Sequence, residues 1–137
     1  MIEIQQVNID KIDKLPDFSL WITNVINNEG FKVGDINYIF CDDSYLYDMN
    51  MKYLKHDTLT DIITFPLSSN SNIISGEIYI SIDRVKENSL MFKTAFEKEL
   101  SRVVVHGVLH LLGYDDHSEE DILEMRKKED YYLSLLP

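Results

Sequence analysis

The chain has 137 residues, of which 45% are hydrophobic, and it carries a formal net charge of −11 at pH 7. This length and composition predict one globular domain over residues 1–137, and the acidic balance argues against general nucleic-acid binding through a basic surface. The single cysteine excludes an internal disulfide, and without a visible signal peptide or long apolar run we expect a cytoplasmic protein with no membrane partner.

Hydrophobic periodicity divides the chain into strands and helices. Strands are predicted where apolar and polar residues alternate or β-branched residues cluster, and helices where apolar residues recur with helical spacing. In chain order we expect an edge strand over 1–7, a helix over 16–28, a strand over 35–41, a helix over 45–54, a strand over 58–65, a polar loop over 67–75, a strand over 76–82, a short helix capped by Asp83, and helices over 94–112 and 118–135.

This order predicts an α+β fold, in which a small mixed sheet of about four strands packs with about five helices. Cys41 ends one of the predicted strands, and we expect its thiol to be buried and structural.

The helix over 94–112 carries a metal-binding pattern. His106 and His110 are four residues apart, so both imidazoles lie on one helix face and can reach one ion. Gly113 then allows the helix to end, and the chain presents Asp116 and His117 as candidate third ligands. Such a set leaves a position on a zinc-type ion open for water. The sequence therefore predicts one divalent metal ion, with zinc expected, on a metzincin-like helix.

One part of the metzincin layout is missing. Those proteases place a glutamate directly after the first histidine as general base, and here Gly107 occupies that position. A peptidase or amidase of that type is therefore disfavoured, although another zinc hydrolase stays an alternative.

Two longer motifs resemble the YbeY family of bacterial metal-dependent endoribonucleases, which are linked to ribosomal RNA maturation and ribosome quality control. His106–Asp115 matches one family signature without a gap, and Asn50–Pro66 matches the second in register. Gly76–Ser81 is also similar to a family strand. The resemblance covers nearly the whole chain. It implies a single-strand-type endoribonuclease with metal-activated water, a ribosomal RNA substrate, and a ribosomal protein or GTPase as partner.

The sequence departs from the family pattern at two positions. Without a gap, the family's third histidine falls on Asp116, so the resemblance implies Asp116 as third ligand, with His117 as the alternative if the loop bulges. The family's arginine after Tyr53 is Leu54 here. The nearby cations that are expected to contact phosphates instead are Lys52, Lys55 and His56.

Two further charged residues are candidates for the surroundings of the metal. Asp61 lies in an apolar segment and needs a partner; it either orients a ligand imidazole from the second shell or caps a turn. Arg102 lies one turn before His106, and we expect its side chain to pair with an acidic residue rather than to contact a phosphate. An alternative function is a non-catalytic ribosome-associated factor, whose structural metal would be closed by Asp115 or His117 as fourth ligand.

Overall fold

The computed structural model describes residues 1–54, 60–67 and 72–136. Its strands are β1 (Ile2–Gln6), β2 (Lys32–Cys41), β3 (Ile62–Pro66) and β4 (Ile73–Ser81), and they form one sheet in the order β1-β2-β4-β3. The pairs β1–β2 and β2–β4 are parallel, whereas β3 runs antiparallel to β4. The strand that ends in proline therefore lies at an edge, where a missing N–H costs no sheet hydrogen bond.

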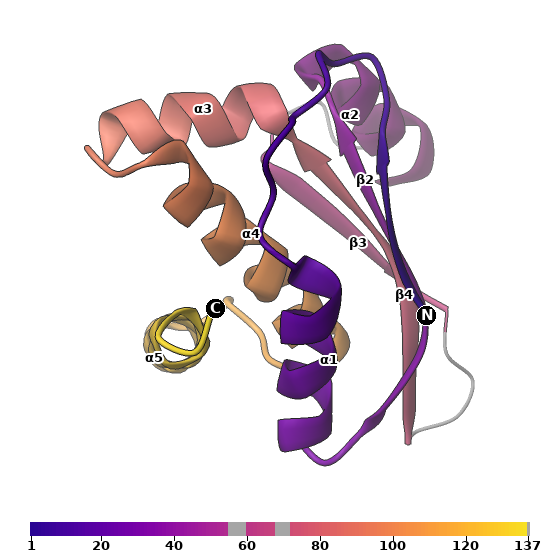
Figure 1. The fold of residues 1–137 in the computed structure, drawn as a ribbon, viewed down its shortest axis with the longest axis vertical. Helices are drawn as coiled ribbons and strands as arrows, with labels where there is room; N and C mark the ends of the chain where they lie inside the picture. Colours follow the sequence, from indigo (N-terminus) through magenta and orange to yellow (C-terminus); the bar gives the residue numbers. More distant parts are fainter. Residues whose placement is uncertain (55–59, 68–71, 137) are drawn as a thin grey trace.

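The helices are α1 (Phe18–Asn28), α2 (Asp43–Met49), α3 (Ile82–Met91), α4 (Phe96–Leu111) and α5 (Glu119–Leu133), and a π-helical turn, η1 (Asn50–Leu54), continues α2. Helices α1 and α4 cover one face of the sheet, α5 lies beside α4, and α2 lies on the far side of the sheet (Figure 1). The mixed four-stranded sheet with five α-helices confirms the predicted α+β class.

Strand β2 shows why helices cover both faces. Tyr38 and Phe40 are fully buried in the main core with α1 and α4, whereas Ile39 and Cys41 pack with Leu46 of α2. Successive side chains of a strand point to opposite faces, so a continuous apolar run requires cover on both. The Cys41 side chain is fully buried, and burial, followed by the charges of nearby aspartates, raises the pKa of its thiol to about 12. The expectation of a buried, structural cysteine is confirmed.

Helix α4 holds the core and the candidate site together. Leu100, Val104 and Val108 are fully buried on its apolar stripe, and Val104 also accepts a hydrogen bond through its carbonyl from the Tyr38 hydroxyl at 2.8 Å. Glu99, Arg102 and His106 lie on another face, which lines a cavity, and Arg102 and His106 contact Glu129 of α5. One helix thus fixes the polar side chains relative to the sheet.

Several boundaries differ from the sequence-based expectation. The strand expected over 58–65 begins at Ile62, with residues 58–59 outside the described part. Strand β4 begins at Ile73 instead of 76, because Ile73 and Ile74 pair with the start of β2. The predicted Asp83 cap is wrong: the Ser81 hydroxyl accepts the hydrogen bond from the backbone N–H of Arg84 at 3.2 Å.

Candidate metal centre

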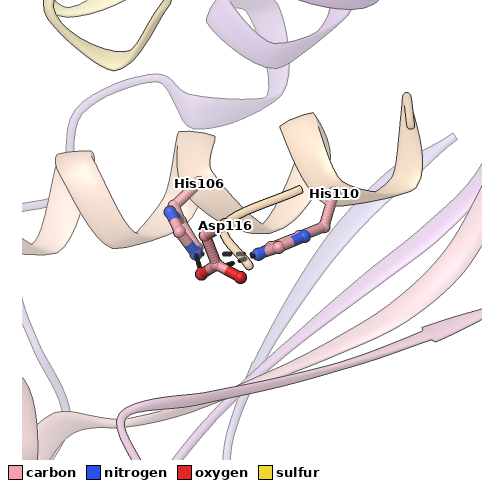
Figure 2. A group of neighbouring side chains, drawn as sticks. All are labelled: His106, His110 and Asp116. Carbon is pink, nitrogen blue, oxygen red and sulfur yellow. Dashed lines mark hydrogen bonds and ion pairs between the residues drawn. The ribbon is translucent and has the colours of Figure 1, made fainter. Parts of the chain in front are cut away.

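His106, His110 and Asp116 bring three donor atoms to one point. The two histidine Nε2 atoms lie 2.9 Å apart, and the Asp116 Oδ2 atom lies 3.6 Å from that of His106 and 3.5 Å from that of His110. Both imidazoles point from α4 toward the carboxylate, which the loop after the helix carries back beneath them (Figure 2). The spacing of four residues and the chain reversal at Gly113, whose φ is +106°, produce this arrangement.

The donor set fits a zinc-type ion. Zn–N and Zn–O bonds of about 2.0–2.1 Å in a tetrahedron place neighbouring donor atoms about 3.3 Å apart. The three observed separations, 2.9, 3.5 and 3.6 Å, lie around that value. Two imidazoles and one carboxylate are also a ligand set that zinc accepts. These three residues could therefore hold one ion and leave its fourth position free.

Glu129 of α5 fixes the orientation of His106. Its Oε2 atom lies 2.7 Å from His106 Nδ1, so an N–H at Nδ1 donates to the carboxylate and the Nε2 lone pair is left facing the other donors. Arg102 donates to the other oxygen of Glu129 at 2.8 Å. Burial raises the pKa of Glu129, but these two hydrogen bonds lower it more, so the group is held ionised.

The two histidines differ in their electrostatic surroundings. Burial lowers the pKa of His106, but the hydrogen bond and charge of Glu129 outweigh burial, and the net pKa is raised above 6.5. Burial and the neighbouring His106 together lower the pKa of His110 below 6.5. His110 is therefore already neutral near neutral pH, whereas a proton on His106 competes with a metal ion.

A second hydrogen-bond cluster positions the loop that carries Asp116. Glu29, at the end of α1, accepts hydrogen bonds from the hydroxyls of Tyr114, at 2.6 Å, and Tyr132. Lys128 also donates to Glu29 at 3.2 Å. Tyr114 is two residues before Asp116, so this cluster ties the ligand loop to α1 and α5.

Gly107 packs against the sheet, and the glutamate that peptidases have at this position would clash with it. A Cβ atom at this position would lie 2.9 Å from side-chain carbons of both Ile62 and Ile78, closer than real Cβ contacts. The position also faces the core rather than the three donor atoms, because Gly107 is buried on the sheet side of α4. The architecture therefore leaves no room for a general base directly after His106.

The two candidates for the third donor have different positions. Asp116 lies beside the imidazoles, whereas the His117 side chain is 83% exposed and its Nε2 atom lies 3.7 Å from the Asp115 carboxylate. The structure thus brings Asp116, and not His117, to the pair on α4.

The phosphate-contact candidates fall in a segment that is only partly described. Lys55 and His56 lie outside the described residues. Lys52 is exposed, and its ammonium lies 5.3 Å from the centre of the Tyr53 ring. Lys52 is not among the described residues that line the cavity next to His106 and Asp116.

Asp61 and Arg102 both lie near the histidines, in different roles. Asp61 precedes β3, and its carboxylate accepts a hydrogen bond from the Asn88 amide at 3.4 Å. Within the described ranges, Glu129 is the carboxylate hydrogen-bonded to Nδ1 of His106, whereas Asp61 acts on His106 through its charge, which raises the pKa of that imidazole. Arg102 forms ion pairs with Glu129 and Asp130, which confirms the expectation that it pairs with an acid.

The importance of Glu129 was not foreseen from the sequence. A signal exists, because Met125, Glu129 and Tyr132 have helical spacing and are all buried on one face of α5. An acid on an apolar helix face needs a buried partner, but the partner, 23 residues away, is revealed only by the fold.

A cavity of about 370 Å³ opens beside the three donors. It is lined by residues from the end of α3, from one face of α4 and from α5. Its lining is mixed, with Asp61, Asn88, Glu99, Arg102, His106, Asp116, Arg126 and Glu129 as polar members and Phe92, Val103, Ile122 and Met125 as apolar ones.

The comparison with protein families identifies the chain. Residues 2–136 match the family model described as endoribonuclease YbeY. This chain belongs to the YbeY family. An endoribonuclease YbeY of Flavobacterium psychrophilum is 56% identical over 115 residues, which cover 84% of this chain and 81% of the relative. An endoribonuclease YbeY of Amoebophilus asiaticus is 49% identical over 123 residues, 88% of this chain and 84% of the relative.

A solved structure agrees with the YbeY assignment. The solution structure of TM1509 from Thermotoga maritima superposes with a TM-score of 0.71 and 33% sequence identity, over 98% of this chain and 87% of that one. The match extends over both the sheet and the helices, so the fold that carries the three donors is shared.

Proposed function

We propose that this chain is a metal-dependent endoribonuclease that acts in ribosomal RNA processing, with His106, His110 and Asp116 as ligands of one zinc ion. Support comes from the family match over residues 2–136 and from three donor atoms whose separations suit a tetrahedral ion. The observation that carries the proposal is the close approach of Asp116 to both imidazoles. Ribosome quality control is the cellular role that we attach to this activity.

The residues around the donors have separate roles. When bound, the ion would lower the pKa of a water molecule toward neutrality and stabilise charge on a phosphoryl oxygen. Glu129 keeps a proton on Nδ1 of His106, so that Nε2 faces the ion, and Arg102 holds Glu129 ionised. We assign contacts with flanking phosphates to the segment from Lys52 to His56, and to Asp61 an electrostatic role from the wall of the cavity.

The arrangement favours an open site over a closed structural one. Among the described residues, 1–54, 60–67 and 72–136, one cluster contains three or more potential metal ligands, and its members are His106, His110 and Asp116. Asp115 lies beside His117 and does not belong to this cluster. A structural zinc site is normally closed by four protein ligands. The geometry therefore supports the hydrolase over a factor with a purely structural metal.

The remaining parts of the proposal concern the setting of the reaction. No helix among the described residues is long and apolar enough to cross a bilayer. We propose a single domain over residues 1–137 that works in the cytoplasm on ribosomal RNA. With a net charge of −11, the chain needs a docking partner, for which we propose a ribosomal protein or a GTPase.

Incubation of the zinc-loaded protein with single-stranded and structured RNA tests the proposal. We expect cleavage that stops on chelation, returns with zinc, and is lost in His110→Ala. His117→Ala is the matched control, because this exposed histidine lies outside the donor group, and it should cleave like the wild type. Absence of metal-dependent cleavage for every RNA, in a protein that holds its zinc, would overturn the proposal.

A further inference from the structure

Glu99 is a largely buried glutamate on the wall of this cavity. It is only 6% exposed, and it lines the cavity next to His106 and Asp116. Burial raises its pKa, and Arg102 acts in the opposite direction. A carboxylate that lines a cavity and is largely removed from bulk water can accept hydrogen bonds from a bound molecule, so a ligand with suitably placed donors would bind favourably here.

The position of Glu99 relates its carboxylate to the metal centre. Glu99 and His106 lie on the same face of α4, seven residues apart, which corresponds to about 10 Å along the helix axis. A single nucleotide spans such a distance from its phosphate to the far edge of its base. A phosphate at the His106 end of the cavity would therefore place its base near Glu99.

The walls of the cavity suit a planar base. Phe92, at the end of α3, borders the cavity with its ring 60% exposed, and Ile122 and Met125 of α5 also line it. Single-stranded RNA is typically recognised by stacking of a splayed base on an aromatic side chain, combined with hydrogen bonds to the edge of the base. The volume of about 370 Å³ lies in the range of small-molecule sites.

We propose that this cavity is a guanine-binding subsite, in which Glu99 accepts hydrogen bonds from the base and Phe92 stacks on it. Guanine presents two adjacent donors, N1–H and the N2 amino group, which match the two oxygens of an ionised carboxylate. Adenine and cytosine present an amino group beside an acceptor nitrogen, and uracil presents one N–H between two carbonyls. Each of these three bases would therefore place one acceptor atom against a carboxylate oxygen, which is repulsive. The inference rests on the proposed ribonuclease function, since it names the nucleotide beside the cleaved phosphate.

The test is an NMR titration of the zinc-loaded protein with GMP, AMP, CMP and UMP, in the wild type and three variants. Glu99→Gln keeps the shape of the side chain but replaces one acceptor oxygen with a donor. We expect the wild type to bind GMP about tenfold more tightly than the other three, and Glu99→Gln to lose that preference. Phe92→Ala should weaken all four by a similar factor, because stacking is sequence-tolerant.

Glu97→Gln is the matched control, because Glu97 is an exposed glutamate of the same helix that does not line the cavity. It should keep the preference for GMP. Equal binding of the four nucleotides by the wild type, or a GMP preference that survives in Glu99→Gln, would overturn the inference. The titration needs no cleavage, so its failure is distinct from failure of the RNA cleavage assay. If both succeed, cleavage sites should lie beside guanines.

Discussion

The Glu129 carboxylate accepts a hydrogen bond at 2.7 Å from Nδ1 of His106, 23 residues earlier in the chain. This contact joins α5 to the face of α4 that carries the proposed metal ligands, and it determines which nitrogen of His106 faces the other two donor atoms. Because Arg102 binds the same carboxylate, the contact belongs to a partly buried chain of charge-assisted hydrogen bonds.

Replacement of Glu129 with glutamine should therefore weaken zinc binding. The amide cannot supply the negative charge that makes His106 a stronger donor, and loss of such a partner raises the dissociation constant for the metal about 10- to 100-fold. Competition titration with a zinc chelator measures this. Glu124→Gln, an exposed change on the same helix, is the control and should leave the affinity unchanged. Equal affinities for the two variants would contradict the orienting role.

The raised pKa of His106 predicts how zinc binding depends on pH. A proton on Nε2 competes with the metal, so apparent affinity falls as pH drops through the pKa of this imidazole. Because Glu129 raises that pKa above 6.5, the fall begins at a higher pH than for an ordinary histidine. In Glu129→Gln the fall should move to lower pH. Chelator competition across neutral and mildly acidic pH measures both curves, and identical midpoints would argue against the assigned cause.

Gly107→Ala should destabilise the protein although it adds only one methyl group. The new Cβ would lie 2.9 Å from carbons of Ile62 and Ile78, and overpacking of this kind typically costs about 1–3 kcal/mol. Denaturant unfolding measures the loss. Adding Ile62→Val to Gly107→Ala removes the Cδ1 atom that would lie 2.9 Å from the new Cβ, and it should restore part of the stability. If Gly107→Ala is as stable as the wild type, helix α4 is less tightly packed against the sheet than described.

Cys41 should resist alkylation in the folded protein. Its side chain is fully buried and its thiol pKa is raised to about 12, so hardly any reactive thiolate exists near neutral pH. Mass spectrometry after iodoacetamide treatment should show no adduct under native conditions and one adduct in denaturant. Rapid native labelling would mean that the packing of α2 on the sheet opens readily.

The sequence predicted the parts of this architecture that depend on local patterns. The spacing of His106 and His110 and the glycine that ends α4 were sufficient to expect a shared donor point, and periodicity was sufficient for the element order. The predicted start of strand β4, at residue 76, was too late. Ile73 and Ile74 extend the strand because they pair with β2, which is a non-local effect. Similarly, neither Glu129 nor the Glu29 cluster could be assigned to the site, since their partners lie on other helices.

Metal analysis of the purified protein tests whether His106, His110 and Asp116 hold one zinc ion, with the wild type compared with His110→Ala, Asp116→Ala and His117→Ala. We expect about one equivalent of zinc in the wild type and in His117→Ala, and loss of the ion in the other two variants. Full zinc occupancy in Asp116→Ala together with loss in His117→Ala would contradict the assignment of the third ligand. Absence of bound metal in the wild type, even after zinc is added, would contradict the site itself.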